Sequence, residues 1–408
     1  MTHILSRRGF MMRSAAIGCS LAASPLVTPM TFASAPWDNR LVVIILRGGL
    51  DGLDAVRPWG DPDFVNARPS LATERDPALA LDNYFGLHPA LAPLMPLWQA
   101  GELGFVHAAS QPYRDKRSHF DGQDLLEAGL ASREGGLRDG WLNRMLQGVP
   151  NVTADTTYAI GREDMLLTRG AALVLRWTPE VDIGLSAQGL MLMELTMQDD
   201  PMLAQAMAQA VNLADQDGDP VVMADEQDMM EGMAADQKVL KGSKSHERIA
   251  DFAAQQLRQD ARITSFSIGG WDTHANQSRV LAKPLSKLAD TILRLKDGVG
   301  ANVWGKTTVI AMTEFGRTVR ENGTKGTDHG TGGVMVLSGG ALRGGKVYGR
   351  WPGLSEAALY DRRDLMPTDD VRRWAAWAMR GSFGLSRDHL ERVVFPGLDL
   401  ADDPNMLL

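Results

Sequence analysis

An aspartate stands beside a histidine, Asp328 and His329, in a glycine-rich segment that leads into the apolar run 334–337. A carboxylate and an imidazole are ligands that metal ions such as zinc accept in proteins. The glycines that follow leave both side chains free to converge on one point. Asp-His pairs also occur in surface turns, but more segments of this kind lie elsewhere in the chain. Together they predict an active site.

A second pair of the same kind follows the apolar run 263–268. In Gly270-Trp271-Asp272-Thr273-His274, the carboxylate and the imidazole are two residues apart. In an extended chain this spacing points both side chains the same way, as ligands of one metal ion require. A lone histidine is more often structural, but an aspartate at this spacing favours a metal-ligand role for Asp272 and His274.

Two more acids stand directly after apolar runs. Asp51 follows the run 41–46 in a tight, glycine-containing turn, and Glu314 follows the run 307–312. Both are predicted metal ligands. Arg317 is predicted to clamp a phosphate or sulfate through its planar fork of donors. The alternatives are that Asp51 caps the next helix and that Glu314 and Arg317 form a surface ion pair.

A different kind of candidate opens a predicted helix at Ser118 and His119. A serine with Asp121 three residues on resembles a capping box, which would explain Ser118 without catalysis. A helix N-terminus is also where an anion is held and where a serine nucleophile is stabilised. Both interpretations of Ser118 stay open, and His119 is a candidate metal ligand, catalytic acid or core residue.

Other catalytic schemes lack their motifs. The chain has no G-x-S-x-G elbow, no G-x-x-x-x-G-K-[ST] phosphate loop and no H-E-x-x-H helix. A nucleotide-binding site or a serine triad therefore has little support. A carbohydrate-modifying enzyme is a further alternative, although no dedicated pair of carboxylates stands out.

Hydrophobic patterning predicts the elements that must position these residues. Short apolar runs, many of them rich in β-branched residues, lie at 41–46, 103–109, 263–268, 307–312 and 334–337 and predict buried strands. Stretches with helical spacing, at 125–130, 246–257 and 281–295, lie between them. This alternation predicts an α/β fold with a mostly parallel sheet and helices on both faces.

In such sheets, ligands bind at the carboxyl ends of the strands. The candidate residues follow the first four runs in the order Asp51, Ser118 with His119, Asp272 with His274, and Glu314 with Arg317. They are therefore expected at one edge of the sheet. Asp328 and His329 precede the fifth run instead, so their loop must fold back toward that edge.

The first 35 residues predict export. Twin arginines, Arg7 and Arg8, precede a moderately apolar stretch that ends in Ala33-Ser34-Ala35, which is typical of a twin-arginine signal peptide and not of a membrane span. Cleavage after Ala33 is an alternative to cleavage after Ala35. Cys19, the only cysteine, faintly resembles a lipoprotein acylation site. A periplasmic or secreted protein without disulfides follows from this interpretation.

Charge limits the choice of partner. Removal of residues 1–35 takes away three arginines and no acids, so the formal charge changes from −8 to −11. An acidic exported protein is a poor candidate for binding nucleic acid or an anionic membrane surface. An anionic substrate would have to be attracted locally, by a metal ion or an arginine. The remaining length favours one large α/β domain, 36–408, with an insertion.

Residues 185–240 differ from the rest in composition, with many methionines and aspartates and no obvious strand. We interpret them as a helical cap or insertion. The methionines are better explained by core packing than by copper binding. An acidic stretch that begins at Asp215 imitates a calcium loop, but Pro220 stands where the sharp turn requires glycine.

The motifs taken together resemble a known family. They include 46–53, Gly86-Leu87-His88-Pro89-Ala90-Leu91, 117–120, Gly140-Trp141-Leu142, 270–274, 313–317 and 326–330, in order along nearly the whole mature chain. In this set the chain is similar to the exported family catalogued as domain of unknown function 1501. That family in turn resembles the alkaline phosphatase and sulfatase superfamily, in which a metal-bound Ser, Thr or Cys attacks a phosphate or sulfate ester.

The resemblance implies roles for individual residues. Asp51 would match the first metal-binding aspartate, Ser118 the nucleophile, Asp272 with His274 the Asp/His pair, Glu314 the next acid, and His329 with Asp328 the last loop. Glu314 lacks the adjacent histidine of the superfamily pattern. The number of metal ions, one or two, therefore remains open.

These observations lead to a functional hypothesis. We expect a periplasmic, metal-dependent hydrolase of small anionic phosphate or sulfate esters, with zinc or manganese as its cofactor. The alternative is a non-catalytic exported binding or assembly protein that keeps the fold and acts through a periplasmic protein partner.

Overall fold

The computed structural model describes residues 37–72, 76–114, 116–134, 136, 139–179 and 245–408. Within this part of the chain, a nine-stranded sheet runs through the centre in the order β10-β4-β9-β8-β1-β7-β5-β6, with β11 beside β4. Its strands are β1 (Arg40–Arg47), β4 (Leu103–Ser110), β5 (Thr157–Ile160), β6 (Leu175–Trp177), β7 (Ile263–Gly269), β8 (Thr307–Met312), β9 (Gly333–Ser338), β10 (Lys346–Tyr348) and β11 (Asp369–Asp370). A small antiparallel pair, β2 (Val56–Arg57) and β3 (Gly86–Leu87), lies apart from it.

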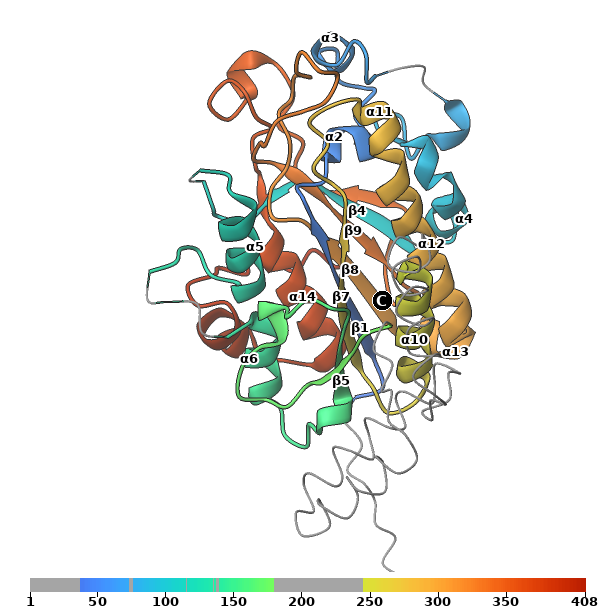
Figure 1. The fold of residues 1–408 in the computed structure, drawn as a ribbon, viewed down its shortest axis with the longest axis vertical. Helices are drawn as coiled ribbons and strands as arrows, with labels where there is room; N and C mark the ends of the chain where they lie inside the picture. The colour runs from blue at the N-terminus through green and yellow to red at the C-terminus, as the bar shows by residue number, and fades with distance from the viewer. Residues whose placement is uncertain (1–36, 73–75, 115, 135, 137–138, 180–244) are drawn as a thin grey trace, which may run out of the picture.

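Helices cover both faces of the sheet, as Figure 1 shows. The described helices are α2 (Gly52–Ala55), α3 (Phe64–Ala67), α4 (Met95–Gln99), α5 (His119–Ala128), α6 (Trp141–Gln147), α10 (Ser245–Arg258), α11 (Gln277–Val280), α12 (Ala282–Val299), α13 (Ala301–Trp304), α14 (Val371–Phe383) and α15 (Arg387–His389). The fold is α/β.

Strand β1 shows why two helical layers are needed. All of its residues from Arg40 to Leu46 are buried, and alternate side chains point to opposite faces. Val42, Ile44 and Leu46 belong to the core under α10 and α12, whereas Leu41, Val43 and Ile45 belong to the core under α6 and α14. Burial on both faces explains why the sequence of β1 is an unbroken apolar run, the pattern from which this strand was predicted.

One strand of the central group runs against the others. β1 pairs in parallel with β7 and β8, but β9 is antiparallel to both β8 and β4. The start of β9 therefore lies at the edge where β4 and β8 end. An antiparallel bridge between Arg317 and His329 holds the preceding loop there. This loop lies at the predicted edge, but it does not have to fold back, because β9 is antiparallel to β8.

The predicted strands are all present, with boundaries that differ by one residue or less. The predicted helices 246–257 and 281–295 correspond to α10 and α12. The predicted helix start at Ser118 is confirmed, since Ser118 is the N-cap of α5. The predicted helical stretch 125–130 is the end of the same helix, which stops at Ala128 because Gly129 adopts a left-handed conformation. Strands β5 and β6 and helix α14 were not predicted.

The predicted signal peptide, 1–35, and the predicted insertion, 185–240, lie outside the described residues. Among the described helices, none combines the length and the apolarity that crossing a bilayer demands.

A buried histidine makes the stability of this core depend on pH. His107, in β4, is 2% exposed. Its Nε2 donates to the carbonyl oxygen of Val56 at 2.9 Å, while Nδ1 accepts from the backbone of Ala108 at 3.0 Å. Burial lowers the pKa of His107 from 6.5 to about 4. The folded protein therefore binds fewer protons at this residue than the unfolded chain between these two values.

We predict that the free energy of unfolding decreases as the pH falls from 6.5 toward 4. His107 should contribute a slope of about 1.4 kcal/mol per pH unit in that window. His107→Gln, which keeps a donor and an acceptor, should reduce the slope by that amount. Chemical denaturation of both proteins at several pH values measures it, and equal slopes would contradict the prediction.

Candidate metal centre

Four side-chain atoms converge at the edge of the sheet where β4, β7 and β8 end. Oδ1 of Asp272 lies 3.0 Å from Nε2 of His274, 3.2 Å from Nε2 of His329 and 3.4 Å from Nε2 of His119. The Nε2 atoms of His274 and His329 are 3.1 Å apart. Ligand atoms of His119, Asp272 and His329 all lie within 4.8 Å of one another. The group that could hold one metal ion is therefore His119, Asp272 and His329, and His274 lies beside two of its members.

The opposite nitrogen of each histidine is bonded to an oxygen. The Nδ1 atoms of His119, His274 and His329 contact, in turn, Oε1 of Glu314 at 2.7 Å, Oδ1 of Asp328 at 3.3 Å and the carbonyl oxygen of Arg117 at 2.8 Å. Ionised carboxylates and carbonyls only accept, so each Nδ1 carries the proton. Each Nε2 then presents its lone pair to the point of convergence. Metal-binding histidines in proteins are oriented in this way.

The environment of His119 tests whether a metal ion fits. Its Nε2 atom is buried and has no hydrogen-bond partner among the described residues, although it faces Oδ1 of Asp272 at 3.4 Å. An imidazole lone pair and a carboxylate oxygen repel each other unless a cation or a proton lies between them. The hydrogen bond to Glu314 raises the pKa of His119 and favours the proton. A divalent ion between His119, Asp272 and His329 would satisfy all three of these atoms, so these residues fit one.

Asp272 is held by Arg317. Nη2 of Arg317 donates to Oδ1 of Asp272 at 2.6 Å. Burial opposes ionisation of Asp272, but the hydrogen bond and the charge of Arg317 outweigh it and lower the pKa to about 2. The carboxylate is 45% exposed and carries its negative charge throughout the physiological range, as a metal ligand must.

The sequence prediction requires a guanidinium of Arg317 that is free to bind a phosphate or sulfate, and the structure does not provide one. Its side chain is 0% exposed, and all three guanidinium nitrogens donate to protein oxygens. These acceptors are the carbonyls of Gly48, Gly49, Trp271 and Thr327 together with the carboxylate of Asp272. Arg317 thus joins the loops of the site from beneath. It is not available to clamp a phosphate or sulfate.

Glu314 and Asp328 lie behind histidines, not among the converging atoms. Glu314 is fully buried and accepts from the backbone of Gly48 at 2.9 Å and from Gln123 at 3.0 Å, besides His119. Burial opposes its ionisation, but these hydrogen bonds lower its pKa. The Asp328 carboxylate also accepts from Asn322 at 3.1 Å, which lowers its pKa. Both acids orient a ligand, whereas the sequence prediction makes them ligands themselves.

Asp51 serves as a helix cap and the partner of a buried arginine. Its Oδ1 accepts from the backbones of Leu53 and Asp54 at the start of α2. Its Oδ2 accepts from Nη1 of Arg68 at 2.7 Å and from Gln277 at 2.7 Å. Both oxygens are therefore committed to donors of the chain. The alternative of helix capping describes this residue better than the predicted metal-ligand role.

Ser118 lies between two parts of the site. It is the N-cap of α5, but its Oγ accepts from Asp121 at 3.5 Å, which is long for a hydrogen bond. The next residue is His119, and the carbonyl of the preceding Arg117 is bound by His329. Arg117 has a φ of +51°, a conformation that costs a non-glycine residue about 1–2 kcal/mol and is part of the turn that leads into Ser118. Ser118 as a residue is half-buried.

Close packing explains the glycines of the histidine loop. A Cβ atom at Gly326 would lie 2.3 Å from the carbonyl carbon of His274, and one at Gly330 would lie 2.3 Å from that of Arg317. These distances are far below contact. The backbone of the Asp328–His329 loop therefore packs directly against the backbone of His274 and against that of Arg317.

Gln277, which the sequence prediction missed, ties the two ligand loops together. Its Oε1 accepts from the hydroxyl of Thr273 at 2.8 Å and from that of Thr327 at 2.7 Å. Its Nε2 donates to Asp51 at 2.7 Å and to Asp54 at 3.0 Å. Thr273 lies between Asp272 and His274, and Thr327 precedes Asp328. A glutamine at the start of a short helix gives no sequence signal of such a role.

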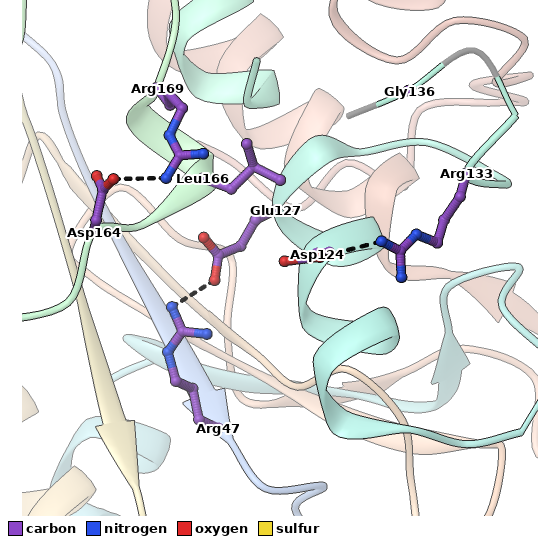
Figure 2. Close-up of a pocket in the computed structure, with 8 residues that line it drawn as sticks. All are labelled: Arg47, Asp124, Glu127, Arg133, Gly136, Asp164, Leu166 and Arg169. Carbon is purple, nitrogen blue, oxygen red and sulfur yellow. Dashed lines mark hydrogen bonds and ion pairs between the residues drawn. The ribbon is translucent and has the colours of Figure 1, made fainter. Parts of the chain in front are cut away.

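A cavity of about 410 Å³ lies apart from the candidate metal centre. Figure 2 shows its arginines directed at acids, with Arg47 paired to Glu127 and Arg169 paired to Asp164, each pair 2.6 Å apart. None of the four converging residues lines it. A chain of hydrogen bonds through Gln123 and Glu314 links Arg47 to His119. The group of His119, Asp272 and His329 therefore lies apart from this cavity.

A family model described as "Protein of unknown function (DUF1501)" matches residues 109–371, well over half of the chain. The chain belongs to the DUF1501 family. The sequence resemblance to this family is thereby confirmed. The DUF1501 match contains all four converging residues and the acids behind His119 and His274, whereas Asp51 precedes it.

Comparison with solved structures finds two mutant forms of TAB5 alkaline phosphatase, each with Mg bound in the M3 site. Both are 12% identical to this chain over 74% of it and 91% of the phosphatase, with TM-scores of 0.31 and 0.32. Similarity at this level is weak, and the α/β class rests on the strand order of the sheet. No curated protein matches this DUF1501 chain.

We predict that Glu314→Gln weakens metal binding by about 10- to 100-fold. The amide can still fill the space, but it loses the charge that fixes the Nδ1 proton of His119. Competition between the protein and a chelator for zinc measures the affinity. Glu102→Gln is the matched control, because Glu102 is a partly buried glutamate that binds Lys296 and Trp304 away from the site. Equal affinities of the Glu314 variant and the wild type would contradict the prediction.

Proposed function

We propose that this protein is a metal-dependent hydrolase of phosphate or sulfate esters that acts in the periplasm after export by the twin-arginine pathway. The observation that carries the proposal is the convergence of Asp272 Oδ1 with the Nε2 atoms of His119, His274 and His329. Each of these four residues has an outer partner that fixes its orientation or charge. A surface cluster of polar residues would not need such partners.

The donor set indicates which ion the centre would take. Two imidazole nitrogens, from His119 and His329, and one carboxylate oxygen, from Asp272, suit zinc or manganese better than calcium or magnesium, which prefer oxygen ligands. His274 lies next to this set. When bound, such an ion supplies Lewis-acid chemistry toward an ester oxygen. The chain contributes fixed ligand directions, because every histidine is held in one tautomer by its Nδ1 partner.

Ser118 is the proposed nucleophile. It directly precedes the ligand His119, and its hydroxyl has only a long bond to the helix that it caps. The N-terminus of α5, a helix of 10 residues, favours negative charge at this place. Asp328, which is bonded to His274, has a side chain that is 53% exposed, more than those of the other candidate acids.

Arg363 replaces Arg317 as the arginine proposed to meet the anionic group of the substrate. Its Nη1 donates to the carbonyl of His329 at 3.0 Å and to Asp364 at 3.0 Å. The side chain is 42% exposed, in contrast to the buried Arg317. A guanidinium anchored by one nitrogen beside a ligand can offer its other donors to a phosphate or sulfate.

We predict that Ser118→Ala lowers ester hydrolysis by a factor on the order of 10⁴ or more, as loss of a nucleophile does. Ser118→Asn should lose activity equally while it keeps the helix cap. Only Ser118→Ala should lose stability, by about 1 kcal/mol. Turnover of aryl phosphates and aryl sulfates by zinc- or manganese-loaded protein, with melting curves, tests both points.

The same experiment separates the two functional hypotheses. Wild-type protein that binds metal but hydrolyses neither class of ester would favour the non-catalytic binding or assembly protein. Full activity in both Ser118 variants would remove the serine from the mechanism and leave capping as its role.

We predict that Arg363→Ala raises KM for an anionic ester about tenfold or more, since it removes a charged hydrogen-bond donor. The neighbouring Arg362→Ala is the matched control, because Arg362 is 80% exposed and pairs with the exposed Glu356. Steady-state kinetics on both variants measures the effect. Equal KM values in the two variants would exclude Arg363 from substrate binding.

A further inference from the structure

We infer that this centre takes one metal ion per chain. A second ion would depend on the adjacent carboxylate of Asp51, and the buried guanidinium of Arg68 already neutralises that carboxylate. This inference rests on the metal centre of the proposed function and specifies its stoichiometry.

Asp51 is the acid in question. It is fully buried next to the ligand loops, as its contacts with Gln277 and with the hydroxyl of Thr327 at 3.3 Å show. A metal ion near the first strand would need its carboxylate. Yet Oδ1 accepts from two backbone amides of α2, and Oδ2 accepts from Arg68 at 2.7 Å. A cation could bind only if it displaced these donors.

The guanidinium of Arg68 cannot move aside without loss of its buried hydrogen bonds. Its side chain is 0% exposed. Nε donates to the carbonyl of Val319 at 2.9 Å, and Nη2 donates to the carbonyl of Thr318 at 2.8 Å. The guanidinium therefore bridges the turn after α3 to the segment that follows Arg317. Displacing it would leave a buried charge without a partner, which costs far more than a surface ion pair returns.

The other buried acids near the site are committed in the same way. Asp54 accepts from two nitrogens of Arg57, at 2.7 and 3.0 Å. Asp364 accepts from Arg117 at 2.8 Å, from Arg363 at 3.0 Å and from the hydroxyl of Thr331 at 2.8 Å. In the part of the chain that the structure describes, these acids supply no second set of ligands.

One consequence concerns the substrate. A two-metal centre can hold the attacking and the leaving oxygens of an ester with one ion each. A one-metal centre must offset the remaining negative charge with residues of the chain. Exposed arginine, not a second ion, is then the cation that an ester would meet.

Metal titration of the full-length protein tests the inference. His246, Glu247 and Asp290 form another group whose ligand atoms lie within 4.8 Å of one another. The titration therefore uses a His246→Ala background, so that this group does not add to the count. Zinc is added to metal-free protein, and the bound equivalents are measured by calorimetry and by elemental analysis after dialysis.

We expect one equivalent in the His246→Ala protein, one equivalent in folded Asp51→Asn, and none in Asp272→Asn. Two equivalents in the His246→Ala protein would overturn this inference alone. So would loss of the single equivalent in an Asp51→Asn protein whose circular dichroism spectrum matches that of the wild type. Absence of binding in the wild type would overturn the metal centre as well. If Asp51→Asn does not fold, the count in the His246→Ala protein decides.

Discussion

The buried amide of Gln277 is the contact on which the geometry of this site depends. It receives hydrogen bonds from Thr273 and Thr327, one in each ligand loop, and donates to Asp51 and Asp54 after β1. Three loops from distant parts of the chain are thereby fixed to one side chain. A buried polar group left without its partner costs about 1–3 kcal/mol. Because all four bonds are satisfied together, the two loops hold a single relative position, and Asp272 and His329 meet at 3.2 Å.

The sheet determines why these loops are neighbours at all. Strands β1, β7 and β8 are parallel and end at one edge, and β9 is reversed so that it begins there. Loops that leave the carboxyl ends of parallel strands form binding sites in many α/β proteins. In this protein β9 is reversed, so the connection between β8 and β9 begins and ends at this edge and contributes His329. The helical layers on both faces bury the strands, which makes the edge rigid enough to position ligands.

Charge around the centre is arranged in pairs. Asp51, Asp54, Asp272 and Asp364 each bind an arginine, so an acidic protein can bury carboxylates beneath its site. Glu314 differs, because its partner is His119, whose Nδ1 donates to it. A buried carboxylate without an arginine must be stabilised by hydrogen bonds and by positive charge on or beyond its histidine. This distinguishes Glu314 from the structural acids and connects it to the metal centre.

The sequence by itself determined the α/β class, the five main strands and the edge at which the candidate residues gather. Apolar runs and their order along the chain carry that information, because burial on both faces leaves a continuous pattern. It also identified His119, Asp272, His274 and His329 as candidates for chemistry. Only the tertiary structure decided which of the candidates converge, that Glu314 and Asp328 stand behind histidines, and that Asp51 and Arg317 are held in ion pairs. Those outcomes depend on partners such as Arg68 and Gln277, whose contacts arise from packing between segments far apart in the chain.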